Sequence, residues 1–215
     1  MRKRVVIGGS IAIAFALLCV GLLGYRIFFL KVVRIPTGSM MNTILPGEEL
    51  LVTKLFGEPH RGDIVMFQYP GDDARYVGRV VGLPGESIQF RDTKILINST
   101  QIDEERVTVG AQTPSAERLA ELSVEGSGPY RVYYTQRSPD GEFDISDDTL
   151  GGNQPWKIPL NNYFILGDNR DNSYDSRFRV AVPRELIWGK ITMIYWSEPV
   201  HGGDARWDRV WKRVK

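Results

Sequence analysis

The feature that most constrains this chain of 215 residues is an uncharged, mostly apolar run of 21 residues from Val5 to Tyr25. As a helix this run would be about 32 Å long, close to the roughly 30 Å hydrocarbon core of a bilayer. The apolar character continues to Leu30 without an Ala-x-Ala-like site, which favours an uncleaved anchor over a cleavable leader. We therefore expect one transmembrane helix over residues 5–30, preceded by a short cytoplasmic N-terminus, residues 1–4.

Positive charges lie on both sides of the expected anchor. Residues 2–4 are Arg, Lys and Arg, the pattern that keeps an N-terminus in the cytoplasm and sends the following domain across the membrane. Arg26, Lys31 and Arg34 on the far side weaken this orientation. The pattern predicts a single-pass protein with the lipid bilayer as partner and its main domain outside the cytoplasm.

The composition excludes several classes of function. Lys and Arg number 27 against 26 Asp and Glu, so no nucleic-acid partner is expected. The single cysteine, Cys19, lies in the apolar run, so the outer domain can hold neither a disulfide nor a cysteine-based metal site. The sequence shows no cluster of metal ligands, and we expect no metal and no cofactor.

Beyond Pro36 the chain consists of short β-branched and aromatic runs separated by Gly and Pro, which predicts a mainly β fold. The residues Asp92 and Thr93 separate two of these runs and predict a hairpin turn. The expected strands are residues 49–52, 63–69, 76–83, 87–91, 94–98, 130–135, 163–166 and 190–196.

Two regions differ from this pattern. Residues 101–153 hold eleven acidic residues, four arginines and no lysine, and we interpret them as an inserted acidic subdomain with a short helix over 116–124. They would lie over a β core formed by residues 31–100 and 154–200; a solvated excursion is the alternative. Residues 201–215 form a basic tail with apolar side chains at helical spacing, which predicts an amphipathic helix. This helix would lie at a membrane surface or pack its tryptophans on the domain.

Two segments of the outer domain could carry chemistry. The first, residues 35–41, places Thr37, Gly38 and Ser39 just beyond the anchor; a serine nucleophile there would need a base and oxyanion donors from elsewhere. The second, residues 167–177, follows an apolar run and is dense in Asp, Asn, Ser and Arg. A charged surface loop or a calcium loop are alternatives, but the EF-hand spacing is missing and two arginines would compete with a cation. Internal Asp–Arg pairing that stiffens the loop fits these residues better.

Together these features resemble the bacterial type I signal peptidases, which are membrane-anchored serine proteases of the Ser/Lys-dyad class. The resemblance implies a signal-peptidase-like β core behind the anchor, in the bacterial inner (cytoplasmic) membrane, with the catalytic domain on the extracytoplasmic side. It implies endopeptidase removal of N-terminal signal peptides from exported preproteins, after small residues in an Ala-x-Ala-like pattern, without cofactor or metal. The segments that carry it, in the family's order, are the anchor, Pro36-Thr37-Gly38-Ser39-Met40, Arg61-Gly62-Asp63-Ile64-Val65, Tyr76-Val77-Gly78-Arg79-Val80-Val81-Gly82-Leu83-Pro84-Gly85 and Gly167-Asp168-Asn169-Arg170-Asp171-Asn172-Ser173-Tyr174-Asp175-Ser176-Arg177.

The resemblance also implies roles for single residues. Ser39 would be the nucleophile, and its backbone amide together with the Thr37 hydroxyl would form the oxyanion hole. Ser173 would hydrogen-bond the catalytic lysine, while Asp175 and Arg177 would form a supporting ion pair. An extended groove would pair with the substrate backbone as an added strand, and its lining is expected to include Ile35, Pro36, Tyr76, Val77 and Val80.

One position departs from the family at the centre of its chemistry. The family's general base is a lysine directly before the arginine of the fourth segment, and Gly78 stands here, beside the permanently protonated Arg79. No other lysine lies in the matched segments, and His60 and His201 lie away from the position at which histidine-using relatives carry theirs. The motif after Arg177 also differs, with Phe-Arg-Val in place of Tyr-Trp-Gly.

Two functions are consistent with this sequence. The first is a signal peptidase that cleaves preproteins. The second is an inactive pseudopeptidase, or an engineered inactive variant, that binds signal peptides without cleaving them. A membrane-tethered scaffold without a peptide groove would not explain the specific sequence of residues 167–177.

Overall fold

The computed structural model describes residues 15, 17–21, 24, 30–54, 57–91, 94–109, 121–125, 128–135, 149–152, 154–199 and 202–214. The expected N-terminus, residues 1–4, and most of the expected anchor, residues 5–30, lie outside this set. Residues 15, 17–21 and 24 are helical, whereas Leu30 already belongs to the first strand. A search of the described residues finds no helix with the length and apolar character needed to span a bilayer.

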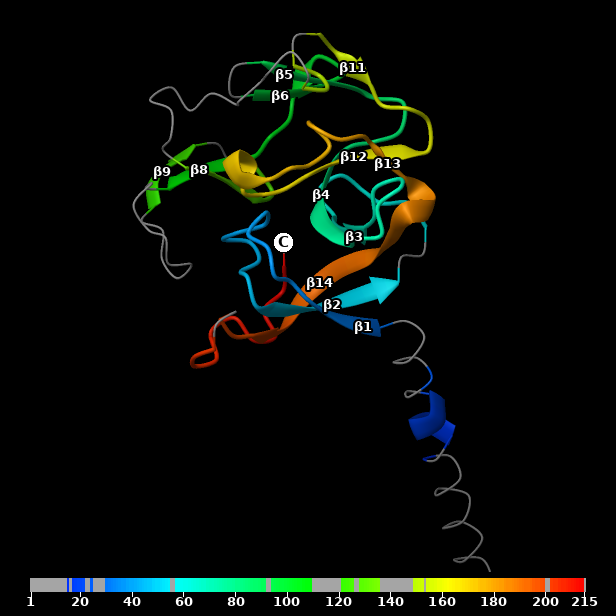
Figure 1. Ribbon diagram of the computed structural model, residues 1–215, viewed down its shortest axis with the longest axis vertical. Coiled ribbons are helices and arrows are strands. Elements are labelled where there is room, and N and C mark those ends of the chain that lie inside the picture. Colours follow the sequence, from blue (N-terminus) through cyan, green and yellow to red (C-terminus); the bar gives the residue numbers. More distant parts are fainter. Residues whose placement is uncertain are drawn as a thin grey trace, which may run out of the picture.

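A seven-stranded antiparallel sheet forms the body of the protein (Figure 1). The long strand β14 pairs with one neighbour on each side, and its register shifts against both of them, which bends the sheet. In sheet order the strands are β1 (Leu30–Arg34), β2 (Glu48–Lys54), β14 (Ile187–Ser197), β3 (Ile64–Phe67), β4 (Tyr76–Gly82), β12 (Asn162–Leu166) and β13 (Val182–Pro183).

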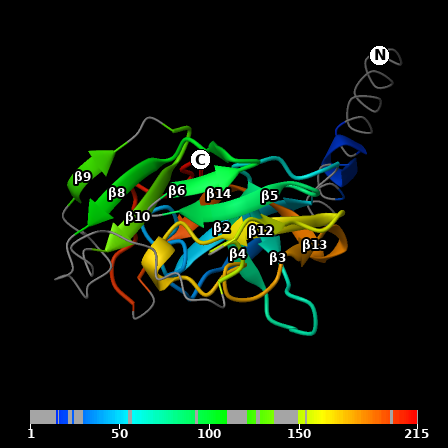
Figure 2. The same ribbon diagram turned by 90° about the horizontal axis from the view of Figure 1, so that it is seen from above.

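Two smaller sheets accompany this body, and the view in Figure 2 shows them beside each other. In Figure 1 the four-stranded sheet lies on the β12 side of the body, opposite the side of β1 and β2. Its order is β11 (Trp156–Lys157), β5 (Ser87–Arg91), β6 (Lys94–Ile97) and β7 (Thr100–Gln101), and the three-stranded sheet has the order β10 (Arg131–Thr135), β8 (Glu105–Val109) and β9 (Glu121–Glu125).

Three apolar clusters fix these sheets to one another. One cluster joins the small sheets to the body, because Phe90 of β5 and Val132 of β10 pack with Phe164 of β12. A second lies beneath the connection between β1 and β2, around Met40 and Ile44. The third lies between β3, β4 and β12. Two short 3₁₀ turns, η1 (Arg170–Asn172) and η2 (Arg184–Leu186), complete the described elements.

The mainly β prediction is confirmed, and every expected strand is present with its ends shifted by at most three residues. The expected hairpin is confirmed as well, since β5 and β6 pair from Arg91 and Lys94 outward, although residues 92 and 93 lie outside the described set. The helix expected over residues 116–124 is wrong for residues 121–124, which pair with β8 as part of β9. Its first five residues are not among those described.

The helix expected in the C-terminal tail is also wrong. Residues 202–214 form turns and a single antiparallel bridge between Met193 and Arg213. Arg209 binds Glu48 at 2.5 Å, and Trp211 has a positive φ of 60°, which a helix does not permit. Tertiary contacts of the arginines therefore override the helical spacing of the apolar residues.

Candidate active site

Ser39 lies in the connection between β1 and β2. The connection begins and ends where the backbone of Ile35 pairs with Gly47 and Glu48, through N–H···O bonds of 2.7 and 2.9 Å. Within it, Met40 is fully buried, and the Ile44 amide donates to the Met40 carbonyl at 2.7 Å. A buried methionine directly after Ser39 thus fixes the turn on the core and leaves the serine partly exposed.

The loop of residues 167–177 follows β12 and contacts the Ser39 turn directly. The Asn169 amide donates to the Ser39 carbonyl at 3.0 Å, and the Asn169 side chain donates to the Gly38 carbonyl at 2.9 Å. The Thr43 hydroxyl donates to the Asp168 carboxylate at 2.6 Å. Two segments that lie far apart in the sequence are therefore joined at the candidate nucleophile.

Buried Asp–Arg pairs hold the loop. Arg79 of β4 binds Asp168 through two N–H···O bonds of 2.8 and 2.6 Å, and both side chains are almost completely buried. Burial alone would lower the pKa of Arg79, but the adjacent Asp168 carboxylate raises it above its ordinary value. Arg177 binds Asp175 through two bonds of 2.9 Å, and Asp175 also accepts the Gly167 amide at 2.9 Å. The ion pair expected between Asp175 and Arg177 is therefore present.

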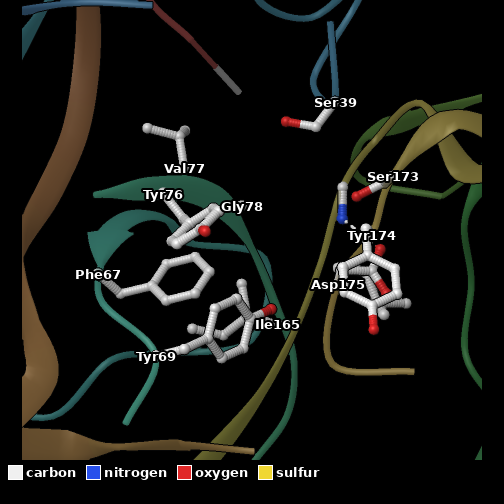
Figure 3. Close-up of a pocket in the computed structure, with 12 residues that line it drawn as sticks. Ser39, Phe67, Tyr69, Tyr76, Val77, Gly78, Ile165, Ser173, Tyr174 and Asp175 are labelled. Carbon is white, nitrogen blue, oxygen red and sulfur yellow. Dashed lines mark hydrogen bonds between the residues drawn. The ribbon is translucent and has the colours of Figure 1, made fainter. Parts of the chain in front are cut away.

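A cavity of about 30 Å³ opens beside Ser39. Figure 3 shows the hydroxyls of Ser39 and Ser173 directed towards the same space next to Gly78. The aromatic side chains that line the other side come from β3 and β4 and the connection between them, namely Phe67, Tyr69 and Tyr76.

Gly78 is buried, and the space for a side chain at this position is taken by neighbours. A Cβ atom on Gly78 would lie 2.7 Å from Cγ2 of Ile165, 3.0 Å from the Leu166 carbonyl oxygen and 3.4 Å from the Phe67 ring. Because real Cβ contacts are longer than 3 Å, a lysine at this position requires Ile165 to move. The resemblance places the family's base at this position, and the structure adds that Ile165 lies against Gly78.

The cavity lining carries no lysine and no histidine among the described residues, and its ionisable side chains are Tyr69, Tyr76, Tyr174 and Asp175. Burial raises the pKa of Tyr69 well above its ordinary value, so this phenol stays neutral and cannot accept a proton. Asp175 is engaged by Arg177 and by a backbone amide. Neither Tyr69 nor Asp175 is therefore placed as an effective base for Ser39.

The remaining residues of the predicted site are in different surroundings. Of the five residues expected to line a groove, Tyr76 and Val77 line the cavity. Ile35 and Val80 are buried in the second and third apolar clusters, and Pro36 is exposed. Thr37, the expected oxyanion donor, is exposed two residues before Ser39.

Sequence reasoning missed the partner of Arg170. This guanidinium is completely buried and binds both carboxylate oxygens of Glu104, one of them at 2.8 Å. Glu104 also accepts the Tyr130 hydroxyl at 3.2 Å, and Tyr134 lies beside Arg170. No sequence signal connects Glu104 with Arg170, since 66 residues separate them. Arg79 and Asp168 lie within the matched segments, but the resemblance implies no role for their ion pair.

Comparisons with known proteins agree with the resemblance seen in the sequence. A family model described as "Signal peptidase, peptidase S26" matches residues 7–196. A signal peptidase I from Rickettsia akari (strain Hartford) is 34% identical over 213 residues, covering 87% of this chain and 79% of the relative. A signal peptidase I from Pseudomonas fluorescens is 32% identical over 208 residues, covering 81% and 68%. A crystal structure of a signal peptidase I from Enterococcus faecalis V583 is 29% identical, with a TM-score of 0.43, and covers 64% of this chain and 100% of that one.

Proposed function

We propose that this chain, which belongs to the signal peptidase family (peptidase S26) of serine peptidases, removes N-terminal signal peptides from exported preproteins. Ser39 would be the nucleophile. Cleavage would follow small residues in an Ala-x-Ala-like pattern. The observation that carries the proposal is the juxtaposition of the Ser39 and Ser173 hydroxyls at one cavity (Figure 3).

The surroundings of Ser39 support a positioned nucleophile. Asn169 binds the backbone of Gly38 and Ser39, and Asp168, which holds the same loop, is itself fixed by Arg79. Such preorganisation matters because a displacement of about 1 Å at a reacting atom can cost about 10²-fold in rate. In this proposal the Ser39 amide and the Thr37 hydroxyl receive the oxyanion.

The place of action follows from the position of Ser39 relative to the apolar run. Ser39 lies nine residues beyond Leu30 in the sequence, so an anchor over residues 5–30 would hold it near the bilayer surface. We propose a single-pass protein of the bacterial inner membrane with its catalytic domain on the extracytoplasmic side. Its partners would be the bilayer and the signal peptides of exported preproteins.

A second candidate function is favoured by one specific observation. Gly78 stands at the position of the family's lysine, and Ile165 packs so closely that no longer side chain fits without movement. A chain without a base would bind signal peptides along the strands near Tyr76 and Val77 but cleave them slowly or not at all. Loss of a general base commonly costs about 10²- to 10⁴-fold in rate.

Cleavage and binding of one preprotein separate the two candidates. The full chain in detergent micelles is mixed with a preprotein that carries an Ala-x-Ala site, and both product formation and binding are measured. Ser39→Ala tests the nucleophile, and Ser87→Ala on β5, whose side chain does not line the cavity, is the matched control.

Cleavage that Ser39→Ala abolishes and Ser87→Ala preserves supports the peptidase. Saturable binding without cleavage, even in long incubations, supports the inactive binder. Cleavage that survives Ser39→Ala contradicts the assignment of the nucleophile, and absence of both cleavage and binding contradicts both functions.

A further inference from the structure

The cavity beside Ser39 has a size that suits a ligand of one or two non-hydrogen atoms. Its volume is about 30 Å³, and one water molecule needs about 10–15 Å³ of such space. It adjoins Gly78, where the family's lysine side chain would begin. A small molecule in this space would therefore lie beside the Ser39 hydroxyl.

The lining of the cavity has hydrogen-bonding capacity that the protein does not use. The side chain of Tyr69 is buried, and among the described residues its hydroxyl makes no hydrogen bond of good geometry, although the Ser176 side chain lies near enough to lower its pKa. The hydroxyls of Ser39 and Ser173 face the same space (Figure 3). A buried hydroxyl without a hydrogen bond lowers stability, and a polar ligand that hydrogen-bonds it would recover this loss.

The charges around the cavity favour a ligand that can be neutral and can accept a proton. The Asp175 carboxylate lines it but is paired with Arg177. The Arg179 guanidinium lies 4.3 Å over the Tyr69 ring and 5.0 Å over the Tyr76 ring. Each guanidinium is paired with a carboxylate, Arg177 with Asp175 and Arg179 with Asp72, so these charges largely cancel. The remaining lining is mainly apolar and aromatic and disfavours the charged form of a bound amine, which would therefore lose its proton more readily than in water.

We propose that this cavity binds ammonia or a small primary amine, whose nitrogen serves as the general base for Ser39. The proposal rests on the proposed function, because it supplies the base that the peptidase reaction requires. An amine from solution would occupy this site in place of a side chain of the protein.

The reaction balances with the amine as a catalyst. The neutral nitrogen takes the Ser39 hydroxyl proton while the serine oxygen bonds to the scissile carbonyl carbon. The resulting ammonium gives that proton to the leaving nitrogen as the C–N bond breaks, which leaves an acyl-serine and the free amine. Water then attacks the acyl-serine, with the amine taking and returning its proton, so that one water is consumed for each peptide bond.

The shape of the cavity predicts which amines act. Ile165 closes the side next to Gly78, so methylamine is accepted, whereas trimethylamine is too bulky. Gly78→Ala places a methyl group against Ile165 and should block the site. Ile165→Ala removes the Cγ2 methyl that closes this side and should extend activation to ethylamine, a change of selectivity that a purely structural role would not produce.

The experiment measures initial cleavage of a preprotein by the full chain in micelles, with increasing methylamine at constant pH and ionic strength. We expect a saturable increase of about 10²-fold or more, dependent on the neutral amine and absent in Ser39→Ala and Gly78→Ala. Equal activation by trimethylamine, or none by methylamine, overturns the proposal. ¹³C-methylamine binding followed by NMR gives a readout independent of catalysis, with binding expected in the native chain and lost in Gly78→Ala.

A double variant separates failure of this proposal from failure of the proposed function. Gly78→Lys combined with Ile165→Ala supplies a tethered amine and the room for it. If this variant cleaves while methylamine has no effect on the native chain, the amine site is refuted and the Ser39 peptidase stands. If neither cleaves, both the amine site and Ser39 as nucleophile are refuted.

Discussion

Replacing Glu104 with alanine should destabilise the protein far more than an ordinary loss of a surface carboxylate. The side chains of Glu104 and Arg170 are 6% and 0% exposed, and the guanidinium contacts both carboxylate oxygens. Without Glu104, this buried charge retains only neutral acceptors among the described side-chain contacts, the Gly167 carbonyl at 3.1 Å and the Tyr134 hydroxyl at 3.4 Å. Breaking a buried pair on one side costs about 3–5 kcal/mol.

The expected effect is measurable by urea and thermal unfolding of the full chain in micelles. In a domain of this size about 1 kcal/mol corresponds to about 2–4 °C, so Glu104→Ala should lower Tm by about 6–20 °C. Glu105→Ala is the matched control on the neighbouring residue, because its pair with Arg131 is 25% and 48% exposed. Exposed pairs contribute about 1 kcal/mol or less.

A double variant tests the stated cause. Glu104→Ala with Arg170→Met removes both charges and should recover the part of the loss that comes from the unpaired guanidinium, because a buried charge without its partner is strongly destabilising. If Glu104→Ala costs no more than Glu105→Ala, the pair does not hold the loop and the reasoning is wrong. If the double variant is as unstable as the single one, the cause is lost packing and not an unpaired charge.

Three further predictions concern the site and two titrating groups. Gly78→Lys should cost about 1–3 kcal/mol in urea unfolding through overpacking against Ile165. The same substitution should cost less when it is made in Ile165→Ala, and an equal cost in both backgrounds would exclude this clash. Burial and Glu58 raise the pKa of Tyr163 to about 12. The contribution of the neutral phenol to folding stability is therefore present below about pH 10 and lost as the pH rises towards 12. The urea midpoint of Tyr163→Phe should accordingly fall less over this pH range than that of the native chain. Hydrogen bonds from a backbone amide, a tyrosine and an arginine lower the pKa of Asp72 to about 2. The contribution of this carboxylate to folding stability is present above about pH 4 and lost as the pH falls towards 2. A pKa near 4 for Asp72 in an NMR titration would contradict this.

The strands could be predicted because their signals are local. Runs of β-branched and aromatic residues between Gly and Pro gave β3, β4, β5, β6 and β12 nearly to the residue. The strand β9 was mistaken for a helix because its residues have no strong local preference, and pairing with β8 decides their conformation. In the tail, Arg206 and Arg209 bind Ser197 and Glu48, contacts that no helical spacing can reveal.

The candidate site residues could be predicted from the sequence, but the packing around them could not. The matched segments contain Ser39, Ser173, Asp175 and Arg177, and their order along the chain indicated a common site. The separation of two residues along the sequence does not determine their distance in space. Neither the pairing of Arg170 with Glu104 nor the contact of Ile165 with Gly78 could therefore be predicted.

The packing around Gly78 limits where a base for Ser39 could be placed. A buried ion pair adds little net stability, yet two of them, Arg79 with Asp168 and Arg177 with Asp175, hold the loop that binds the Ser39 backbone. Pairs of this kind are more useful for fixing a geometry than for stabilising a fold. Because Ile165 lies against the position that a Cβ atom on residue 78 would take, a side chain at residue 78 requires Ile165 to shift or to be replaced. The loop contacts that hold the Ser39 turn are thus present while the space beside Gly78 is occupied by Ile165, which is the combination from which we propose an untethered base.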